Sequence, residues 1–222
     1  MVSGKIKIVH KTHKFETELA LALDVADKTV TQLREDYFSN QVVISSIKKD
    51  VKTEADISAH NYIYKSLLCT GIPILSEEEK QIEDFDINVS QWIIDPIDGT
   101  YNFTRKFPYS AVSIALWVDG NPVIGVIKNI FDQSLFYSCV NQGAFRNKEK
   151  IYVSKVENVS EAVLATGFPS GSSYKPANLE KTLNNIKSFK KIRMIGSAAL
   201  MLCYVGCGIF DAYSEEDIYI WD

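Results

Sequence analysis

The chain has 222 residues, of which 46% are hydrophobic and 23% charged, and its net charge is −4. This length suffices to bury a core without disulfides or metals, and the composition excludes fibrous and disordered proteins. No stretch reaches the apolar length of a membrane span and the basic N-terminus lacks the pattern of a secretory signal, so we expect a cytoplasmic protein with no membrane partner.

Two helices are predicted in the first third of the chain. Hydrophobic residues recur at spacings of three and four, which predicts one long amphipathic helix over about residues 14–38. Its expected apolar face consists of Phe15, Leu19, Leu23, Ala26, Val30, Leu33 and Tyr37. A shorter helix is predicted after Asp56, with Ile57, Tyr64, Leu67 and Leu68 on its apolar side.

After about residue 90 the hydrophobic pattern becomes typical of strands. The predicted strands span residues 91–94, 111–118, 123–127, 135–140, 151–154, 163–166 and 192–195. Residues 119–122 are a predicted turn and residues 169–176 a predicted loop, and two further helices are expected at 179–189 and 197–206. Hairpins outnumber strand–helix–strand units, so a mixed α/β fold is favoured over a plain Rossmann sheet.

The composition also limits the kinds of partner. The four cysteines form no CxxC pair and lie far in sequence from the three histidines, so we interpret them as reduced thiols and not as zinc ligands. Lys and Arg are not interleaved with aromatic residues, which argues against nucleic acid as a partner.

The densest chemical signal is a pair of carboxylates at the end of an apolar strand. Pro96 blocks regular backbone pairing and Gly99 permits a sharp turn, so Asp95, Asp98 and the Ile97 carbonyl can point at one spot. Two carboxylates about 4 Å apart repel by roughly 4 kcal/mol at an effective dielectric of 20, a cost that a bound cation removes. The alternative is that both residues merely cap a turn.

Two further acidic segments follow apolar stretches. One is Ser76 to Glu79, which reads SEEE, and the other is Trp221-Asp222 at the end of the chain. Taken alone, the first could be a solvated surface turn and the second a frayed terminus. Together with the strand-end carboxylates they suggest one shared site.

These segments resemble the inositol monophosphatase family, a group of lithium-sensitive, magnesium-dependent phosphatases, over about residues 15 to 222. The most specific match is WIIDPIDGTYNF at Trp92 to Phe103, which contains the family's D-P-I-D-G-T core. The SEEE segment stands where the family usually has Gly-Glu-Glu, and the closing Trp-Asp also matches. Further matches are Gln142 to Phe145 and Thr166 to Pro169.

The resemblance implies a site for two or three Mg2+ ions. Glu77, Asp95 and the Ile97 carbonyl would hold a first ion, Asp95, Asp98 and Asp222 a second, and Glu77 would face a third. Oxygen ligands without His or Cys are what a hard cation such as Mg2+ prefers, so the chemistry agrees with the resemblance.

The resemblance also assigns roles around the reacting phosphate. Catalytic roles fall to Asp56, Glu77, Asp95, Asp98 and Thr100, with Thr100 and Asp56 orienting the attacking water. Substrate binding falls to Gly99, Thr100, Gly196, Ser197, Ala198, Glu215 and Asp222. If a helix opens at Gly99 and Thr100, their backbone N–H groups form a phosphate cradle. Asp56 could instead be a residue favoured at a helix N-terminus, and Glu215 a surface residue.

The implied protein is a phosphomonoesterase with the family's layered αβαβα sandwich, in a homodimer. It would hydrolyse inositol monophosphate or a similar polyol or sugar phosphate through metal-activated water, without a phosphoenzyme. Alternatives on the same scaffold are a 3'(2'),5'-bisphosphate nucleotidase, a fructose-1,6-bisphosphatase and a non-catalytic regulatory homologue. Asn102-Phe103 favours the polyol-phosphate enzyme, whereas Ser76 and Tyr101 depart from the usual pattern or vary with substrate.

Relatives continue beyond the Trp-Asp motif, which bears on the domain boundaries. We expect an N-terminal extension over residues 1–13 and a catalytic domain over 14–222 that lacks the family's C-terminal segment. A second metal site weakened at Asp222 would follow. Apolar surface would then be exposed near Ile209, Phe210, Ile218 and Ile220.

Overall fold

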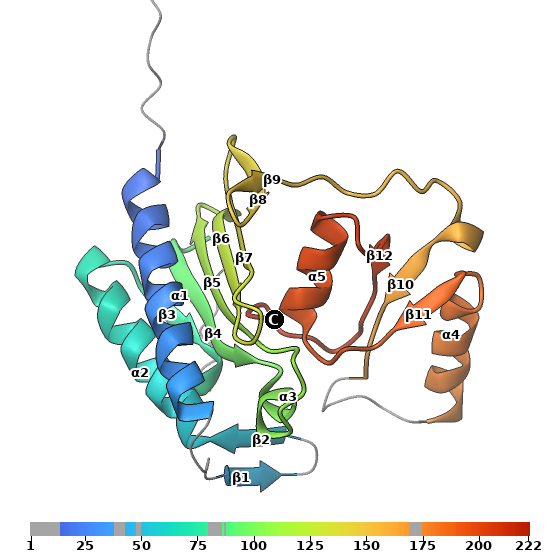
Figure 1. The fold of residues 1–222 in the computed structure, drawn as a ribbon, viewed down its shortest axis with the longest axis horizontal. Helices are drawn as coiled ribbons and strands as arrows, with labels where there is room; N and C mark the ends of the chain where they lie inside the picture. Colours follow the sequence, from blue (N-terminus) through green and yellow to red (C-terminus); the bar gives the residue numbers. More distant parts are fainter. Residues whose placement is uncertain (1–13, 38–42, 48–49, 80–85, 87, 169–174) are drawn as a thin grey trace, which may run out of the picture.

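A computed structural model describes residues 14–37, 43–47, 50–79, 86, 88–168 and 175–222 (Figure 1). The expected extension over residues 1–13 and most of the predicted loop at 169–176 lie outside these residues. None of the helices in the described part is long and apolar enough to span a membrane.

The fold consists of five layers, alternately helical and sheet (Figure 1). Helices α1 (Glu16–Tyr37) and α2 (Glu54–Leu67) cover one face of a seven-stranded sheet. Helix α5 (Ala198–Gly206) lies between that sheet and a three-stranded sheet, and α4 (Pro176–Ile186) lies beyond the smaller sheet. The predicted αβαβα sandwich is therefore confirmed.

The large sheet has the strand order β3-β4-β5-β6-β7-β8-β9. Its strands are β3 (Ile74–Ser76), β4 (Gln91–Asp98), β5 (Ala111–Val118), β6 (Asn121–Asn129), β7 (Leu135–Cys139), β8 (Gly143–Arg146) and β9 (Glu149–Lys150). Strand β3 runs parallel to β4 and every other neighbouring pair is antiparallel. A two-residue turn with positive φ at Asp119 and Gly120 joins β5 to β6 and matches the twist of the hairpin.

The small sheet is entirely parallel, with the order β11-β10-β12. Its strands are β10 (Val163–Ala165), β11 (Lys191–Arg193) and β12 (Ala212–Tyr213). A separate hairpin consists of β1 (Val43–Ile47) and β2 (Asp50–Thr53). Short helical turns are α3 (Thr100–Thr104), η1 (Leu68–Thr70), η2 (Glu77–Glu79) and η4 (Val159–Glu161).

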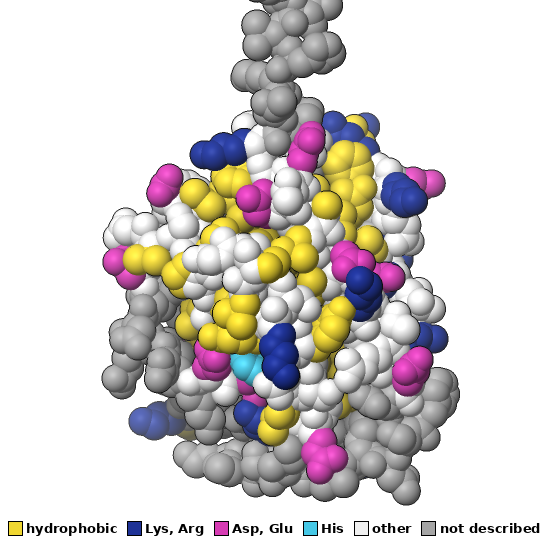
Figure 2. Space-filling model, turned by 90° about the vertical axis from the view of Figure 1, so that its left-hand side faces the viewer, with side chains coloured by type: hydrophobic (Ala, Val, Ile, Leu, Met, Phe, Trp, Pro, Cys, Tyr) yellow, Lys and Arg dark blue, Asp and Glu magenta, His cyan; other side chains and the backbone are white. Residues whose placement is uncertain are grey.

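The main core lies between the helix layer and the large sheet. Val30 and Leu33 of α1 and Ile63 of α2 are almost fully buried there, against Trp92 and Ile114 of the sheet. Each side chain of this size contributes about 1.5–3 kcal/mol on burial. The opposite, outer face of the helix layer shows hydrophobic side chains lying between charged ones (Figure 2).

The predicted apolar side of α2 is correct at Leu67 and wrong at Ile57 and Leu68. Ile57 and Leu68 are 38% and 53% exposed, and the buried stripe consists of Ala55, Ala59, Ile63 and Leu67 at a spacing of four. The prediction followed the larger side chains. In the structure two alanines face the core because α2 packs closely against α1 and β4.

The predicted strand at 151–154 is also wrong: the Ile151 N–H still donates to the Ala144 carbonyl of β8, but the segment then leaves the large sheet and crosses to the small one (Figure 1). Tyr152 and Val153 are 69% and 66% exposed. Of the four residues expected on an exposed apolar surface, Ile209, Ile218 and Ile220 are exposed, whereas Phe210 is buried beside Tyr204.

Candidate active site

A β-bulge brings Asp95 and Asp98 to the same side of β4. Asp95 pairs with Ser113 and Asp98 with Ala111, so Pro96 and Ile97 oppose the single residue Val112. In a regular strand, residues three apart point to opposite faces, and one extra residue reverses that relation. Proline cannot donate a ladder hydrogen bond, which explains why pairing fails at this point. Both carboxylates are nearly fully buried.

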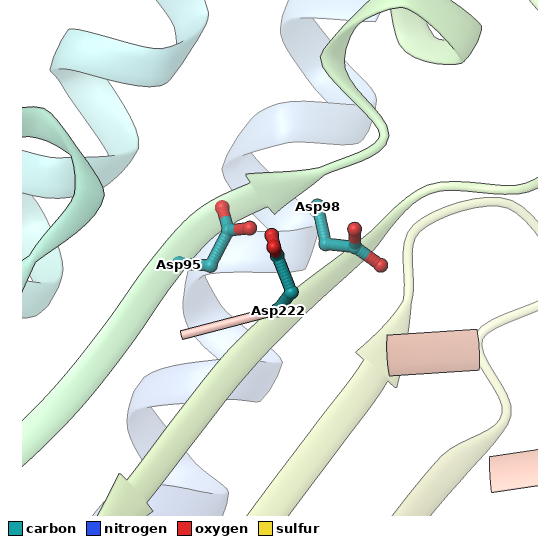
Figure 3. Close-up of side chains that lie close together, drawn as sticks. All are labelled: Asp95, Asp98 and Asp222. Atoms are coloured by element: carbon teal, nitrogen blue, oxygen red, sulfur yellow. The ribbon is translucent and has the colours of Figure 1, made fainter. Parts of the chain in front are cut away.

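The last residue of the chain completes a group of three carboxylates. One oxygen each of Asp95, Asp98 and Asp222 lies within 4.8 Å of the other two, and Figure 3 shows the side chains converging. Asp222 is positioned by Trp221, which is buried against Leu75 and Ile93. The Tyr219 backbone N–H also donates to Asp222 Oδ2 over 2.6 Å.

Glu77 joins this group from the neighbouring strand. Strands β3 and β4 are parallel, with Ser76 opposite Ile94, so Glu77, which follows β3 as the first residue of η2, comes beside Asp95. The two carboxyl groups lie within hydrogen-bonding reach of each other. Burial, together with nearby carboxylates, raises the pKa of Glu77 to about 8 and that of Asp95 well above its usual value.

The start of α5 holds Asp98. Ser197 is the N-cap residue, and its hydroxyl donates to Asp98 Oδ2 while accepting from the Leu200 N–H. The backbone N–H groups of Ala199 and Ala198 donate to the Asp98 carboxylate over 3.0 and 3.3 Å. Burial nevertheless raises the Asp98 pKa to about 7, because desolvation outweighs these bonds. Ser197 and Ala198, predicted to bind substrate, thus contact a predicted metal ligand.

Thr100 and Asp56 form the predicted pair. Thr100 opens α3, and its Oγ1 lies 3.0 Å from both Asp56 Oδ1 and the Ile97 carbonyl oxygen. Asp56 also accepts from the backbone N–H and the hydroxyl of Thr53, as part of a capping box that starts α2. Burial raises its pKa to about 6, although the Thr53 hydrogen bonds act in the opposite direction. Asp56 therefore serves the helix start and the site together.

These groups lie in a pocket of about 640 Å3. Every residue predicted for the site lines this pocket except Asp56, which lies behind Thr100. Glu215 lines it from the opposite side, where its carboxylate accepts from the Tyr213 hydroxyl over 3.1 Å. Burial raises the Glu215 pKa, so the alternative of a plain surface residue is not supported.

Sequence reasoning missed two features of the pocket. The Asn102 side chain donates to the carbonyls of Tyr109, Ile195 and Gly196, so it ties α3 to the loop before α5. The mouth of the pocket carries partly exposed apolar residues, namely Tyr101, Phe107, Phe168, Met194, Ile218 and Tyr219. Only the place of Asn102 in the motif could have indicated its hydrogen bonds. The apolar mouth could not be predicted, because its residues come from segments distant in sequence.

The donor set fits a hard divalent cation. The converging groups offer carboxylate and carbonyl oxygens without imidazole or thiolate, which suits Mg2+ better than zinc or copper. Burial raises the pKa of all four carboxyl groups, and neighbouring carboxylates raise those of Glu77, Asp95 and Asp98 further. A bound cation would favour their charged forms.

The pH dependence of stability tests this crowding. The folded-state pKa values of Glu77 and Asp98 lie near 8 and 7, whereas unfolded carboxyl groups titrate near about 4. Between these limits the folded protein binds more protons, so these groups make the free energy of unfolding fall as pH rises from about 4 to 8. We expect urea titrations to show a steeper fall in chelator than in saturating Mg2+. Equal slopes would contradict the crowding.

Replacing Gly99 tests the tight turn between the two halves of the site. Gly99 has φ of 82°, and an added Cβ would lie 2.9 Å from the carbonyl oxygens of Gly196 and Tyr109. We expect Gly99→Ala to lower the free energy of unfolding by more than the roughly 1–2 kcal/mol that a left-handed L-residue costs by itself. The control is Gly71→Ala, with φ of 67° and open space around it, which should cost only that amount. Equal losses in urea unfolding would show that Gly99 is not sterically confined.

Known proteins are similar to this chain in sequence and in fold. An inositol-1-monophosphatase of Synechocystis sp. is 35% identical over 93% of this chain and 74% of its own length. A Nus factor SuhB of Pasteurella multocida is 37% identical over 67% of this chain and 56% of its own length, so the chain spans about half of that relative. The crystal structure of the extragenic suppressor protein SuhB from Bartonella henselae has a TM-score of 0.82 and 33% identity, covering 93% of this chain and 81% of that one.

The layered fold and the buried carboxylate pocket, shared with relatives named inositol-1-monophosphatase, define the class as phosphoric monoester hydrolases. The chain belongs to the inositol monophosphatase family, whose sequence profile matches residues 15–222.

Proposed function

We propose that this protein hydrolyses the phosphate monoester of a small polyol or sugar, with inositol monophosphate as the first candidate, in a reaction that requires Mg2+. The observation that supports this most is the convergence of the Asp95, Asp98 and Asp222 carboxylates within 4.8 Å, beside Glu77 and in the same pocket as Thr100. A site of this kind holds cations, and cations attract phosphate.

The ligands divide between two positions. Glu77, Asp95 and the Ile97 carbonyl would hold one Mg2+, and Asp95, Asp98 and Asp222 another, with Glu77 facing any third ion. When bound, these ions would polarise the phosphate oxygens, lower the pKa of a coordinated water and neutralise the leaving alkoxide. The neutral carboxyl groups implied by the raised pKa values would release their protons on binding.

Thr100 and Asp56 would orient the attacking water. With Asp56 ionised, the Thr100 hydroxyl donates its proton to Asp56 Oδ1, which leaves a lone pair on Oγ1 free to accept a hydrogen bond from water. The pKa of about 6 for Asp56 favours this ionised form at neutral pH. The backbone N–H groups of Gly99 and Thr100, at the start of α3, would bind phosphate oxygens.

The pocket lining supports a substrate with one phosphate. None of the described residues that line it is Lys or Arg, whereas six are carboxylates, namely Glu77, Asp95, Asp98, Glu215, Asp217 and Asp222. A second phosphate away from the metals would meet negative charge, so the bisphosphate nucleotidase and fructose-1,6-bisphosphatase alternatives are disfavoured. Glu215 would accept hydrogen bonds from polyol hydroxyls, and Gly196 would shape the same wall. Asn102 and Phe103, which favour a polyol phosphate by resemblance, are engaged with the protein itself: the Asn102 amide donates to backbone carbonyls and Phe103 is buried.

A regulatory role is the second candidate, because one relative is named Nus factor SuhB. Phosphate release from inositol monophosphates, sugar monophosphates, fructose 1,6-bisphosphate and adenosine 3',5'-bisphosphate separates the possibilities. We expect Mg2+-dependent release from polyol monophosphates, inhibition by Ca2+ and Li+, and a dimer by light scattering. Full activity in excess chelator would overturn the metal assignment, and no activity on any substrate would favour regulation.

A further inference from the structure

A histidine from α2 contacts the corner that carries Glu77, which consists of residues Ser76 to Glu79. Ser76, the last residue of β3, is almost fully buried, and its Oγ lies 2.8 Å from His60 Nδ1. The Glu78 backbone N–H donates to the same oxygen over 3.3 Å. Ser76 is also the position at which the chain departs from the glycine expected before the two glutamates. The hydroxyl therefore supplies a contact that a glycine could not make.

One arrangement of protons satisfies this network. Ser76 Oγ accepts from the Glu78 N–H, and its own proton can point at His60 Nδ1, in which case this nitrogen is the acceptor. In that tautomer the ring proton lies on Nε2, which faces Glu79 Oε1 at 3.8 Å. His60 thus contacts the corner on both sides of Glu77.

Three of the four residues in the corner contact side chains of α2 or β2. Ser76 and Glu79 face His60, and Glu78 forms an ion pair with Lys52 of β2. Because η2 is a single helical turn of three residues, fixing these neighbours fixes the backbone of Glu77. Glu77 is the remaining glutamate of the corner, and it faces Asp95 in the pocket.

We propose that His60 is a positioning residue that, through Ser76, holds the Glu77 carboxylate beside Asp95 and so strengthens cation binding. This inference rests on the proposed metal site, because Glu77 is one of the proposed ligands. His60 acts on it only through Ser76. Partners of this outer kind typically change metal affinity by about 10- to 100-fold when they are removed.

The test measures Mg2+ binding by isothermal titration calorimetry on His60→Leu, Ser76→Ala and the double variant, with thermal melting of each. We expect each single change to raise the Mg2+ dissociation constant by about 10-fold, the lower end of the effect of losing an outer partner. The double variant should be no weaker than either single one, since both remove the same contact. His60→Asn, whose amide can still accept from Ser76 at the place of Nδ1, should retain most of the affinity.

The matched control is Ser58→Ala. Ser58 lies on the same helix as His60, and its hydroxyl accepts from the Gln32 side chain of α1. This variant should leave the dissociation constant unchanged. Additive effects, or lost melting temperature with unchanged Mg2+ affinity in the variants, would overturn the positioning role while leaving the metal site intact. Failure of the unaltered protein to bind Mg2+ would overturn the metal site itself and the inference with it.

Discussion

Asp95→Asn should abolish turnover while leaving the protein folded. Asp95 lies between Glu77 and Asp98 and is the carboxylate expected to contact both cations. We expect kcat to fall by more than about 100-fold, because loss of an outer partner alone costs a metal site about 10- to 100-fold. Steady-state kinetics at saturating Mg2+ measures this effect.

The same variant should be more stable than the unaltered protein in chelator at pH 8. The asparagine oxygen can still accept from the Ile97 N–H, and its NH2 group can donate to Glu77. The replacement removes a buried group whose pKa is raised, and such a group makes folding less favourable as pH rises.

Thermal melting with and without Mg2+ distinguishes the causes. The unaltered protein should gain stability from Mg2+ by mass action, and Asp95→Asn should gain much less. Asp119→Asn is the charge-matched control, because Asp119 is exposed in a β-turn with positive φ that asparagine also tolerates. It should melt and turn over as the unaltered protein does. Near-normal turnover of Asp95→Asn would contradict the two-cation arrangement.

The sequence predicts the outline of the site because its main feature is local. A proline and a glycine beside two aspartates within five residues specify a disrupted strand and a turn, and the structure contains a bulge at that place and positive φ at Gly99. The spacing also predicts α1, and Ala26, Val30 and Leu33 of its expected apolar face are buried, although Ala22 and Val25, outside that expected face, are buried too. The helix predicted at 197–206 is confirmed as α5, with Ser197 as its cap.

What local pattern could not predict depends on contacts between distant segments. The α2 face was misassigned because small alanines are buried only where another helix approaches closely. Residues 151–154 have strand composition, but after the Ile151 N–H bonds to the Ala144 carbonyl of β8 the segment leaves the sheet. The hydrogen bonds from the start of α5 to Asp98 join residues about a hundred positions apart, and no periodicity reports such a contact.

Thr100→Val should lower kcat by about 100-fold or more with little change in KM, in line with the roughly 10²–10⁴-fold contribution of positioned proton-transfer groups. Valine keeps the branched shape at the first position of α3 and removes only the hydroxyl that bonds Asp56 and the Ile97 carbonyl. The metal ligands stay, so substrate should still bind. Thr100→Ser, which restores a hydroxyl, should recover much of the rate.

Thr104→Val is the matched control, since its hydroxyl lies in the same short helix and donates only to the Tyr101 carbonyl over 2.8 Å. It should leave kcat unchanged, whereas a mere effect of hydroxyl loss on α3 would lower the rate of both variants.

The pH profile gives an independent check. Because Asp56 has a raised pKa of about 6, the rate of the unaltered protein should fall as pH drops through this value, when Asp56 takes a proton and Thr100 loses its acceptor. In Thr100→Val that acidic limb should shift or flatten, and an unchanged limb would show that Asp56 does not act through Thr100.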